Sequence, residues 1–142
     1  MSAEENKALV RRFFDEFCTG RKLELASEIM TPDHVYHDPQ APGLPGPDGM
    51  AQTVAVYQNS VNGHWQIEEI EAAENDRVVM RWTGSGTHIG EINGIPPTGK
   101  PVRVDAMSLL RIKDGKIAEN WTVWDTLGFL QQLGVAPTAA PA

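Results

Sequence analysis

The chain has 142 residues, of which 41% are hydrophobic and 22% are charged, the balance of an ordinary globular domain that can build a core without disulfides. Its net charge of -7 opposes binding to phosphate backbones and anionic lipid, so neither nucleic acid nor a membrane is an expected partner. No apolar run approaches the roughly 20 residues of a membrane helix, and the acidic start is unlike a signal peptide, so a cytoplasmic location is expected.

The first half of the chain is typical of helices. Ser2 followed by Glu5 matches a capping box, which marks the start of a helix. Pro47 stands where the first turn of a later helix accepts a proline. Apolar residues recur at every third or fourth position after both signals. The helices predicted on these grounds cover about residues 3–18, 23–29 and 47–61.

The second half of the chain changes to strands. Asp114-Gly115 is a two-residue hairpin signal between two β-rich runs. The expected extended segments are residues 34–38, 65–71, 77–88, 101–113 and 116–124. A short last helix is expected over residues 126–133, and the low-complexity end is predicted to be disordered. The chain is therefore divided into a single domain, residues 1–134, and a tail, residues 135–142.

Helices first and antiparallel strands afterwards indicate an α+β fold. Three helices cannot cover both faces of a sheet of four or five strands, so we expect them on one face of a curled sheet. The result is a cone with an opening, which is a natural site for a small ligand. Apolar residues such as Val79 are expected on the outer face, which predicts a homodimer or a higher homo-oligomer.

Three stretches resemble the SnoaL-like polyketide cyclase (ester cyclase) family of the nuclear transport factor two-like superfamily: residues 94–100, 111–117 and 124–134. Their order and spacing carry the likeness, which extends over residues 5–134. The resemblance implies a cone-shaped α+β barrel, in which a curved antiparallel sheet wraps around three N-terminal helices. It also implies closure of polyketide rings by intramolecular aldol chemistry without cofactor or metal.

Aldol chemistry needs a base that removes a proton next to a carbonyl, and donors that hold the resulting enolate. The resemblance places the family's acid/base aspartate at Thr122, on the last strand, and a pocket histidine at Ser108, on the preceding strand. Neither side chain can act as a base near neutral pH. Family pocket positions on the first and third helices fall on Phe17 and Thr53.

Asp38 is the acidic residue that is best placed to act as the base. Strand alternation puts it on the same side as His34 and Tyr36, and the Asp-Pro pair resembles that of ketosteroid isomerases. An apolar cone disfavours the charged form of a carboxylate and so makes it a stronger base. The alternative is a turn in which this carboxylate accepts hydrogen bonds from nearby backbone N–H groups. The Tyr36 hydroxyl is a candidate oxyanion donor.

The remaining candidates lie on the last strands. Asn120, Thr122 and Trp124 alternate onto one face and are expected to contact the substrate. Asp125 falls on the opposite face, immediately before a helix, where an N-cap is expected. His88, near the end of a strand, is a candidate substrate contact, and is expected to be a rim or a structural residue rather than a catalyst.

No metal site is expected. His34 and His37 point to opposite faces of an extended segment and cannot share one ion. Cys18 is the single cysteine and is predicted to be a buried structural thiol.

The sequence thus predicts a small cofactor-free enzyme that acts on an apolar, carbonyl-bearing small molecule by proton transfer. A cyclase, an isomerase or an aldol-type lyase fits this description, with Asp38 as the catalytic base. Two alternatives stay open. One is a non-catalytic protein that binds a hydrophobic ligand and has lost the family's acid/base pair. The other is an epoxide-opening hydrolase, for which only Arg81 could supply an arginine in the cavity.

Overall fold

The structure is a computed structural model that describes residues 2–41 and 43–137. The helical segments are α1 (Ala3–Arg12), η1 (Phe13–Thr19), η2 (Leu23–Leu25), α2 (Ala26–Ile29), α3 (Gly46–Val61) and α4 (Thr126–Leu133). The strands are β1 (Met30–His37), β2 (His64–Ala73), β3 (Arg77–Thr87), β4 (Pro101–Lys113) and β5 (Lys116–Trp124). The predicted α+β order is confirmed, and no helix in the described part is long and apolar enough to cross a membrane.

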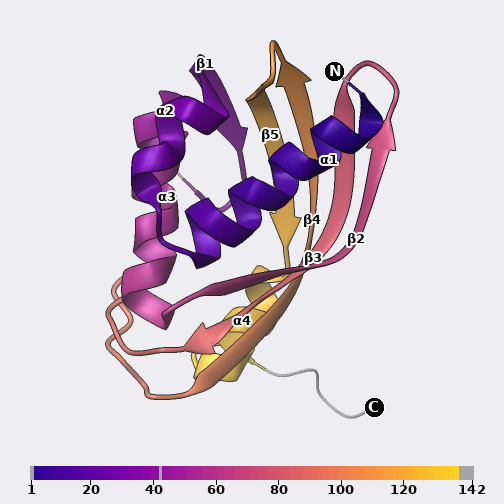
Figure 1. The fold of residues 1–142 in the computed structure, drawn as a ribbon. Coiled ribbons are helices and arrows are strands. Elements are labelled where there is room, and N and C mark those ends of the chain that lie inside the picture. The colour runs from indigo at the N-terminus through magenta and orange to yellow at the C-terminus, as the bar shows by residue number, and fades with distance from the viewer. Residues whose placement is uncertain (1, 42, 138–142) are drawn as a thin grey trace.

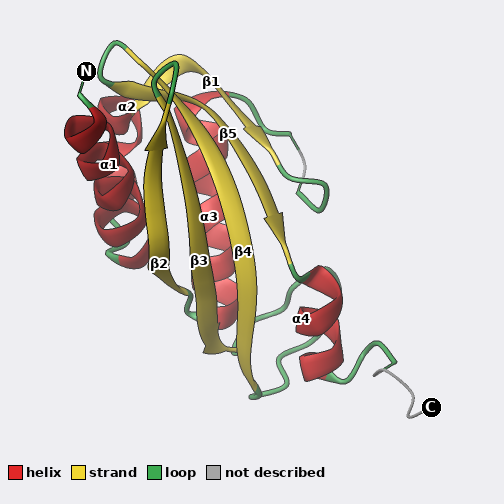
Figure 2. Ribbon diagram, turned by 90° about the vertical axis from the view of Figure 1, so that its right-hand side faces the viewer, coloured by secondary structure: helices red, strands yellow, loops and turns green. Residues whose placement is uncertain are grey.

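The strands form one five-stranded curved sheet with the order β1-β5-β4-β3-β2. The sheet curls around α1, α2 and α3, and α4 lies at one end of it (Figure 1). Figure 2 shows the outer face of the sheet, with α3 behind the strands and α1 and α2 beside β2. The sheet is antiparallel except at one edge, where β1 runs parallel to β5. A parallel pair needs a long connection, and here α3 and three strands supply it.

The main core fills the space between the helices and the inner face of the sheet. Its members come from α1, η1, α2, α3 and the strands, and include Val10, Phe13, Phe14, Phe17, Ile29, Met50, Val54, Met80, Trp82 and Leu110. Each fully buried large apolar side chain stabilises the fold by about 1.5–3 kcal/mol. A second cluster packs beneath α4 and comprises Val61, Ile92, Val102, Phe129 and Leu133.

The first helix starts as predicted but changes type in its second half. Both bonds of the capping box are present, from Glu5 N to Ser2 Oγ (3.1 Å) and from Ser2 N to Glu5 Oε1 (3.1 Å). From Phe13 the backbone becomes π-helical, although a regular helix was expected up to Cys18. Such π segments are rare and often occur at functional sites. The η1 segment contributes three residues to the cavity described below.

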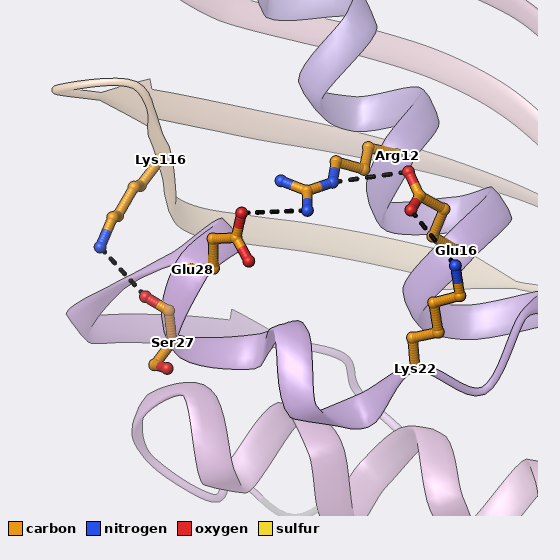
Figure 3. A network of polar contacts seen from close by, with 6 residues as sticks. All are labelled: Arg12, Glu16, Lys22, Ser27, Glu28 and Lys116. Carbon is orange, nitrogen blue, oxygen red and sulfur yellow. Dashed lines mark hydrogen bonds and ion pairs between the residues drawn. The ribbon is translucent and has the colours of Figure 1, made fainter.

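A group of exposed ion pairs and a lysine contact join the helices to the sheet (Figure 3). The Arg12 guanidinium pairs with Glu16 (3.4 Å) and Glu28 (3.0 Å), which links α1, η1 and α2. Lys116 Nζ donates to the Ser27 carbonyl (3.0 Å) and connects the start of β5 to α2. Exposed pairs of this kind contribute about 0–1 kcal/mol each, so the apolar core, rather than these pairs, holds the helices on the sheet.

The predicted disordered tail is only partly described. Val135 N donates to Leu130 O (3.1 Å), and Gln131 Nε2 donates to Pro137 O (2.7 Å), so residues 135–137 continue to contact α4. Residues 138–142 of that predicted tail lie outside the described residues.

Candidate functional site

A cavity lies between the inner face of the sheet and the helical segments η1 and α3. Its apolar wall includes Phe13, Phe14, Met50, Val54, Trp65, Trp82, Val104 and Phe129. Its polar lining includes Tyr36, Asp38, Thr53, Tyr57, Asn120, Thr122 and Trp124. The free volume is about 80 Å³, enough for several water molecules. A multi-ring ligand would therefore require the lining side chains to move apart.

The Asp38 carboxylate is held at this cavity by three donors. Tyr36 Oη donates to Oδ2 (3.0 Å), Trp124 Nε1 donates to the same oxygen (3.2 Å), and Gln40 N donates to Oδ1 (2.8 Å). The turn expected at Asp-Pro and the cavity-facing carboxylate are therefore both present. A carboxylate has about four acceptor positions, so Oδ1 keeps one that is not used.

The pairing of β1 with β5 brings the polar residues together. Tyr36 pairs with Asn120 and His37 with Trp121 in parallel register, so alternate residues of both strands face the cavity side by side. Asp38 follows directly after β1, where the chain leaves the sheet. The position of the carboxylate is thus fixed by the end of an edge strand.

Two tyrosines near Asp38 remain protonated donors at neutral pH. Burial, and then the charge of Asp38, raise the pKa of Tyr36 well above its ordinary value. The same two causes raise the pKa of Tyr57 to about 12. The only proton of the Tyr36 hydroxyl is already donated to Asp38, which leaves it none for a substrate oxygen. Tyr57 stands edge-on to Trp124 (6.0 Å between centroids), and its hydroxyl makes no hydrogen bond to the described residues.

A row of buried polar side chains crosses the sheet at the cavity, and three of its four members line the cavity wall. Trp82 Nε1 donates to Ser108 Oγ (2.9 Å), and Ser108 Oγ lies 2.7 Å from Thr122 Oγ1. Thr122 Oγ1 in turn lies 3.1 Å from Asn120 Oδ1. Ser108 is therefore placed behind Thr122 and does not line the cavity itself.

Other predicted site residues are placed as follows. Thr53 lines the cavity and donates to the Gly49 carbonyl (2.9 Å). Phe17 packs in the core against Phe13 (5.4 Å between centroids) and does not contribute to the cavity lining. His88 is fully buried and does not line the cavity, and its Nδ1 lies 3.0 Å from Thr98 Oγ1 in the β3–β4 loop, which agrees with the structural alternative and not with a substrate contact at the rim.

Asp125 is an N-cap, as predicted, because Gly128 N donates to its Oδ1 (2.9 Å). The predicted burial of Cys18 is also confirmed. Burial, and then the charge of Asp15, raise the pKa of its thiol well above the ordinary value, so Cys18 contributes a neutral thiol to the lining.

The histidines of β1 lie on opposite sides of the strand, as alternation predicted. His34 is buried, with 2% of its surface exposed, whereas His37 is exposed and its Nε2 lies 2.6 Å from Glu119 Oε2. Among the described residues no three His, Cys, Asp or Glu side chains gather in an arrangement that could hold a metal ion.

Tyr57 and Trp82 are aromatic residues that the sequence assigns first to the core, although in a cone some of these aromatics must also line the ligand; both line the cavity, and no polar role was predicted for either. Helical spacing could have identified Tyr57, because it follows Thr53 by four residues on the same helix face. No sequence signal marks the bond from Trp82 to Ser108, which joins residues 26 positions apart.

Comparison with known proteins gives a consistent result. The family model described as SnoaL-like polyketide cyclase matches residues 8–133. The aklanonic acid methyl ester cyclase DnrD of Streptomyces peucetius is 33% identical over 131 residues, which cover 89% of this chain and 88% of the relative. The nogalonic acid methyl ester cyclase of Streptomyces nogalater is 31% identical over 120 residues, which cover 83% of this chain and 89% of the relative.

Two solved structures share the fold. AclR of Streptomyces galilaeus, described as a hydroxylase, has a TM-score of 0.84 and 28% identity, over 98% of this chain and 91% of its own. IdmH of Streptomyces antibioticus, described as a polyketide cyclase, has a TM-score of 0.76 and 30% identity, over 92% of this chain and 99% of its own.

Proposed function

Because this chain belongs to the SnoaL-like polyketide cyclase family, we propose that it closes or isomerises a polyketide-type substrate by moving a proton next to a carbonyl, without a cofactor. Its relatives are named as cyclases of aklanonic and nogalonic acid methyl esters, which are the first compounds to test as substrates. The largely apolar wall of the cavity suits an aromatic polyketide.

The observation that carries this proposal is the Asp38 carboxylate at the cavity, with one acceptor position of Oδ1 unused. That oxygen takes a proton from a carbon next to a carbonyl, and the electron pair of the broken C–H bond forms an enolate. The enolate carbon then attacks a second carbonyl of the same molecule and forms the ring bond. Asp38 returns its proton to the resulting alkoxide, so no other reactant is needed.

A non-catalytic binding protein is the second candidate, and one observation favours it. The positions expected for the family's acid/base pair carry hydroxyl groups, which bond to each other and cannot act as bases (Ser108 and Thr122, 2.7 Å apart). The epoxide-opening hydrolase has no such support. Arg81, its expected arginine, pairs with the exposed Glu69 (2.9 Å) and does not line the cavity.

The test is the substitution Asp38→Asn, with turnover of aklanonic acid methyl ester as the assay. Asparagine keeps the shape and can accept from Tyr36 and Trp124, but it cannot take up a proton. We expect kcat to fall about 10²–10⁴-fold with little change in substrate affinity.

Asp125→Asn is the matched control, because asparagine caps a helix about as well as aspartate and Asp125 is outside the cavity. Full turnover by the Asp38→Asn variant would remove Asp38 as the base. Tight binding of the ester by the wild-type protein with no turnover would favour the binding protein.

A further inference from the structure

Four buried polar side chains form a continuous chain across three strands. Trp82 lies on β3, Ser108 on β4, and Thr122 and Asn120 on β5. Ser108 and Thr122 stand directly opposite each other in the antiparallel pairing, which allows their 2.7 Å contact. All four have 8% or less of their surface exposed, so bulk water has little access to these bonds.

The Trp82 indole sets the direction in which the hydrogen bonds of this series are donated. An indole N–H can only donate, so Ser108 Oγ must accept from Trp82. The single proton of Ser108 is then free for Thr122, and the Thr122 hydroxyl donates to Asn120 Oδ1 (3.1 Å), with the Tyr36 hydroxyl as a second neighbour. If the Ser108–Thr122 bond were reversed, the buried proton of Ser108 would have no acceptor in this chain, which is costly. All protons therefore point from β3 toward the cavity.

This direction fixes the amide of Asn120. Its Oδ1 is occupied by the Thr122 hydroxyl, so the Nδ2 group is the part of the amide that remains for another partner. None of the described residues accepts a hydrogen bond from Nδ2, and Asn120 lines the cavity beside Tyr36. The Tyr36 proton is donated to Asp38, whereas the Asn120 amide has two protons available.

We infer that the Asn120 amide Nδ2 holds the substrate carbonyl oxygen as it becomes an enolate, and that Trp82, Ser108 and Thr122 are positioning residues that keep this donor turned toward the cavity. The inference rests on the proposed function, because an enolate forms only if the protein moves a proton. Donors that are oriented in advance at a developing oxyanion typically contribute about 10²–10³-fold in rate.

The first arm of the test is kinetic. Asn120→Ala should lower kcat about 10²–10³-fold. Trp82→Phe and Ser108→Ala each remove one hydrogen bond from this series of four side chains. Each should lower kcat about tenfold, the equivalent of one neutral hydrogen bond, with KM little changed. In the Asn120→Ala background Ser108→Ala should have no further effect on kcat, because no donor is left to orient. Ser60→Ala removes another buried hydroxyl, bonded within α3 outside the cavity, and should leave kcat unchanged.

The second arm does not require turnover. A naphthol is bound to the Asp38→Asn variant, where no carboxylate opposes a negative charge, and its ionised fraction is read from its absorbance. Removing an amide donor with Asn120→Ala should lower the ionised fraction at a given pH, and Ser108→Ala should lower it in part.

The two arms separate the inference from the proposed function. If Asp38→Asn abolishes turnover while Asn120→Ala retains it, the role of Asn120 is overturned and the cyclase remains. If the wild-type protein has no turnover, the naphthol arm still tests the donor, and an unchanged ionised fraction in Asn120→Ala overturns it. If Ser108→Ala lowers kcat by the same factor with and without Asn120, the chain has only a structural role and the positioning is refuted.

Discussion

Because of His34, the free energy of unfolding should depend on pH between pH 6.5 and about 4. The side chain is buried on the inner side of β1, and its Nε2 has no hydrogen-bond partner among the described residues. Burial lowers the pKa of His34 from 6.5 to about 4. The negative charges of Glu119 and Asp33 raise this pKa, and His37 lowers it further, but burial has the largest effect.

The sign follows from proton binding in the two states. Between pH 6.5 and about 4 the unfolded chain binds a proton at this position and the folded chain does not, so the free energy of unfolding falls as the pH falls. Because one unit of pKa difference corresponds to 1.36 kcal/mol, the loss should approach about 3 kcal/mol at pH 4. Above pH 6.5 the imidazole is neutral in both states and the effect disappears.

The assay is urea unfolding at several pH values from 8 to 4, for the wild-type protein and for His34→Gln, whose amide does not titrate. Carboxylates titrate in both proteins and cancel in the comparison, so the difference isolates His34. We expect the wild-type protein to lose about 3 kcal/mol more than the variant between pH 7 and pH 4. His34→Met is a second neutral replacement if the glutamine variant does not fold. Equal losses in wild type and variant would refute a neutral buried imidazole.

Three further predictions concern assembly, capping and metals. The protein should sediment as a homodimer at micromolar concentration, because Met107 and Val123 are 50% and 60% exposed on the outer face of the sheet. The double variant Met107→Glu with Val123→Glu should sediment as a monomer. A monomeric wild-type protein would contradict this interface. In urea unfolding, Asp125→Ala should cost about 1 kcal/mol and Asp125→Asn almost nothing; equal losses would show that the cap bond is unimportant. Chelators should leave the melting temperature and turnover unchanged, because no three candidate metal ligands cluster among the residues that the structure describes. A drop in melting temperature or in turnover on adding a chelator would disprove this.

The order of elements could be predicted because each carries a local signal. The Asp114-Gly115 pair is one example: both residues have positive φ angles (51° and 76°), which the tight turn between two antiparallel strands requires. The shared cavity face of Asn120, Thr122 and Trp124 follows from strand alternation in the same way. Such signals depend on neighbouring residues only, so the sequence shows them directly.

Features that depend on distant residues could not be predicted. The π-helical turn at Phe13 has the same apolar spacing as a regular helix, and only packing selects between them. The parallel pairing of Tyr36 with Asn120 joins residues 84 positions apart, and no turn sequence specifies it. The bond from Trp124 Nε1 to Asp38, which holds the proposed base, depends on that pairing.

This pairing offers a physical reason why a hydroxyl can occupy the position expected for the family's aspartate. Asp38 follows the last pair of β1 and β5, His37 with Trp121, and the Tyr36 side chain contacts both Asp38 and Thr122, so these two residues lie on the same side of the cavity. Two carboxylates in such proximity would share one proton, and each would disfavour ionisation of the other. A neutral Thr122 leaves the charge of Asp38 unopposed and frees the Thr122 hydroxyl to orient Asn120. If Asp38 is the base, the carboxylate therefore stands just beyond the end of the neighbouring strand β1, and the Thr122 hydroxyl is left to orient the donor that the same reaction needs.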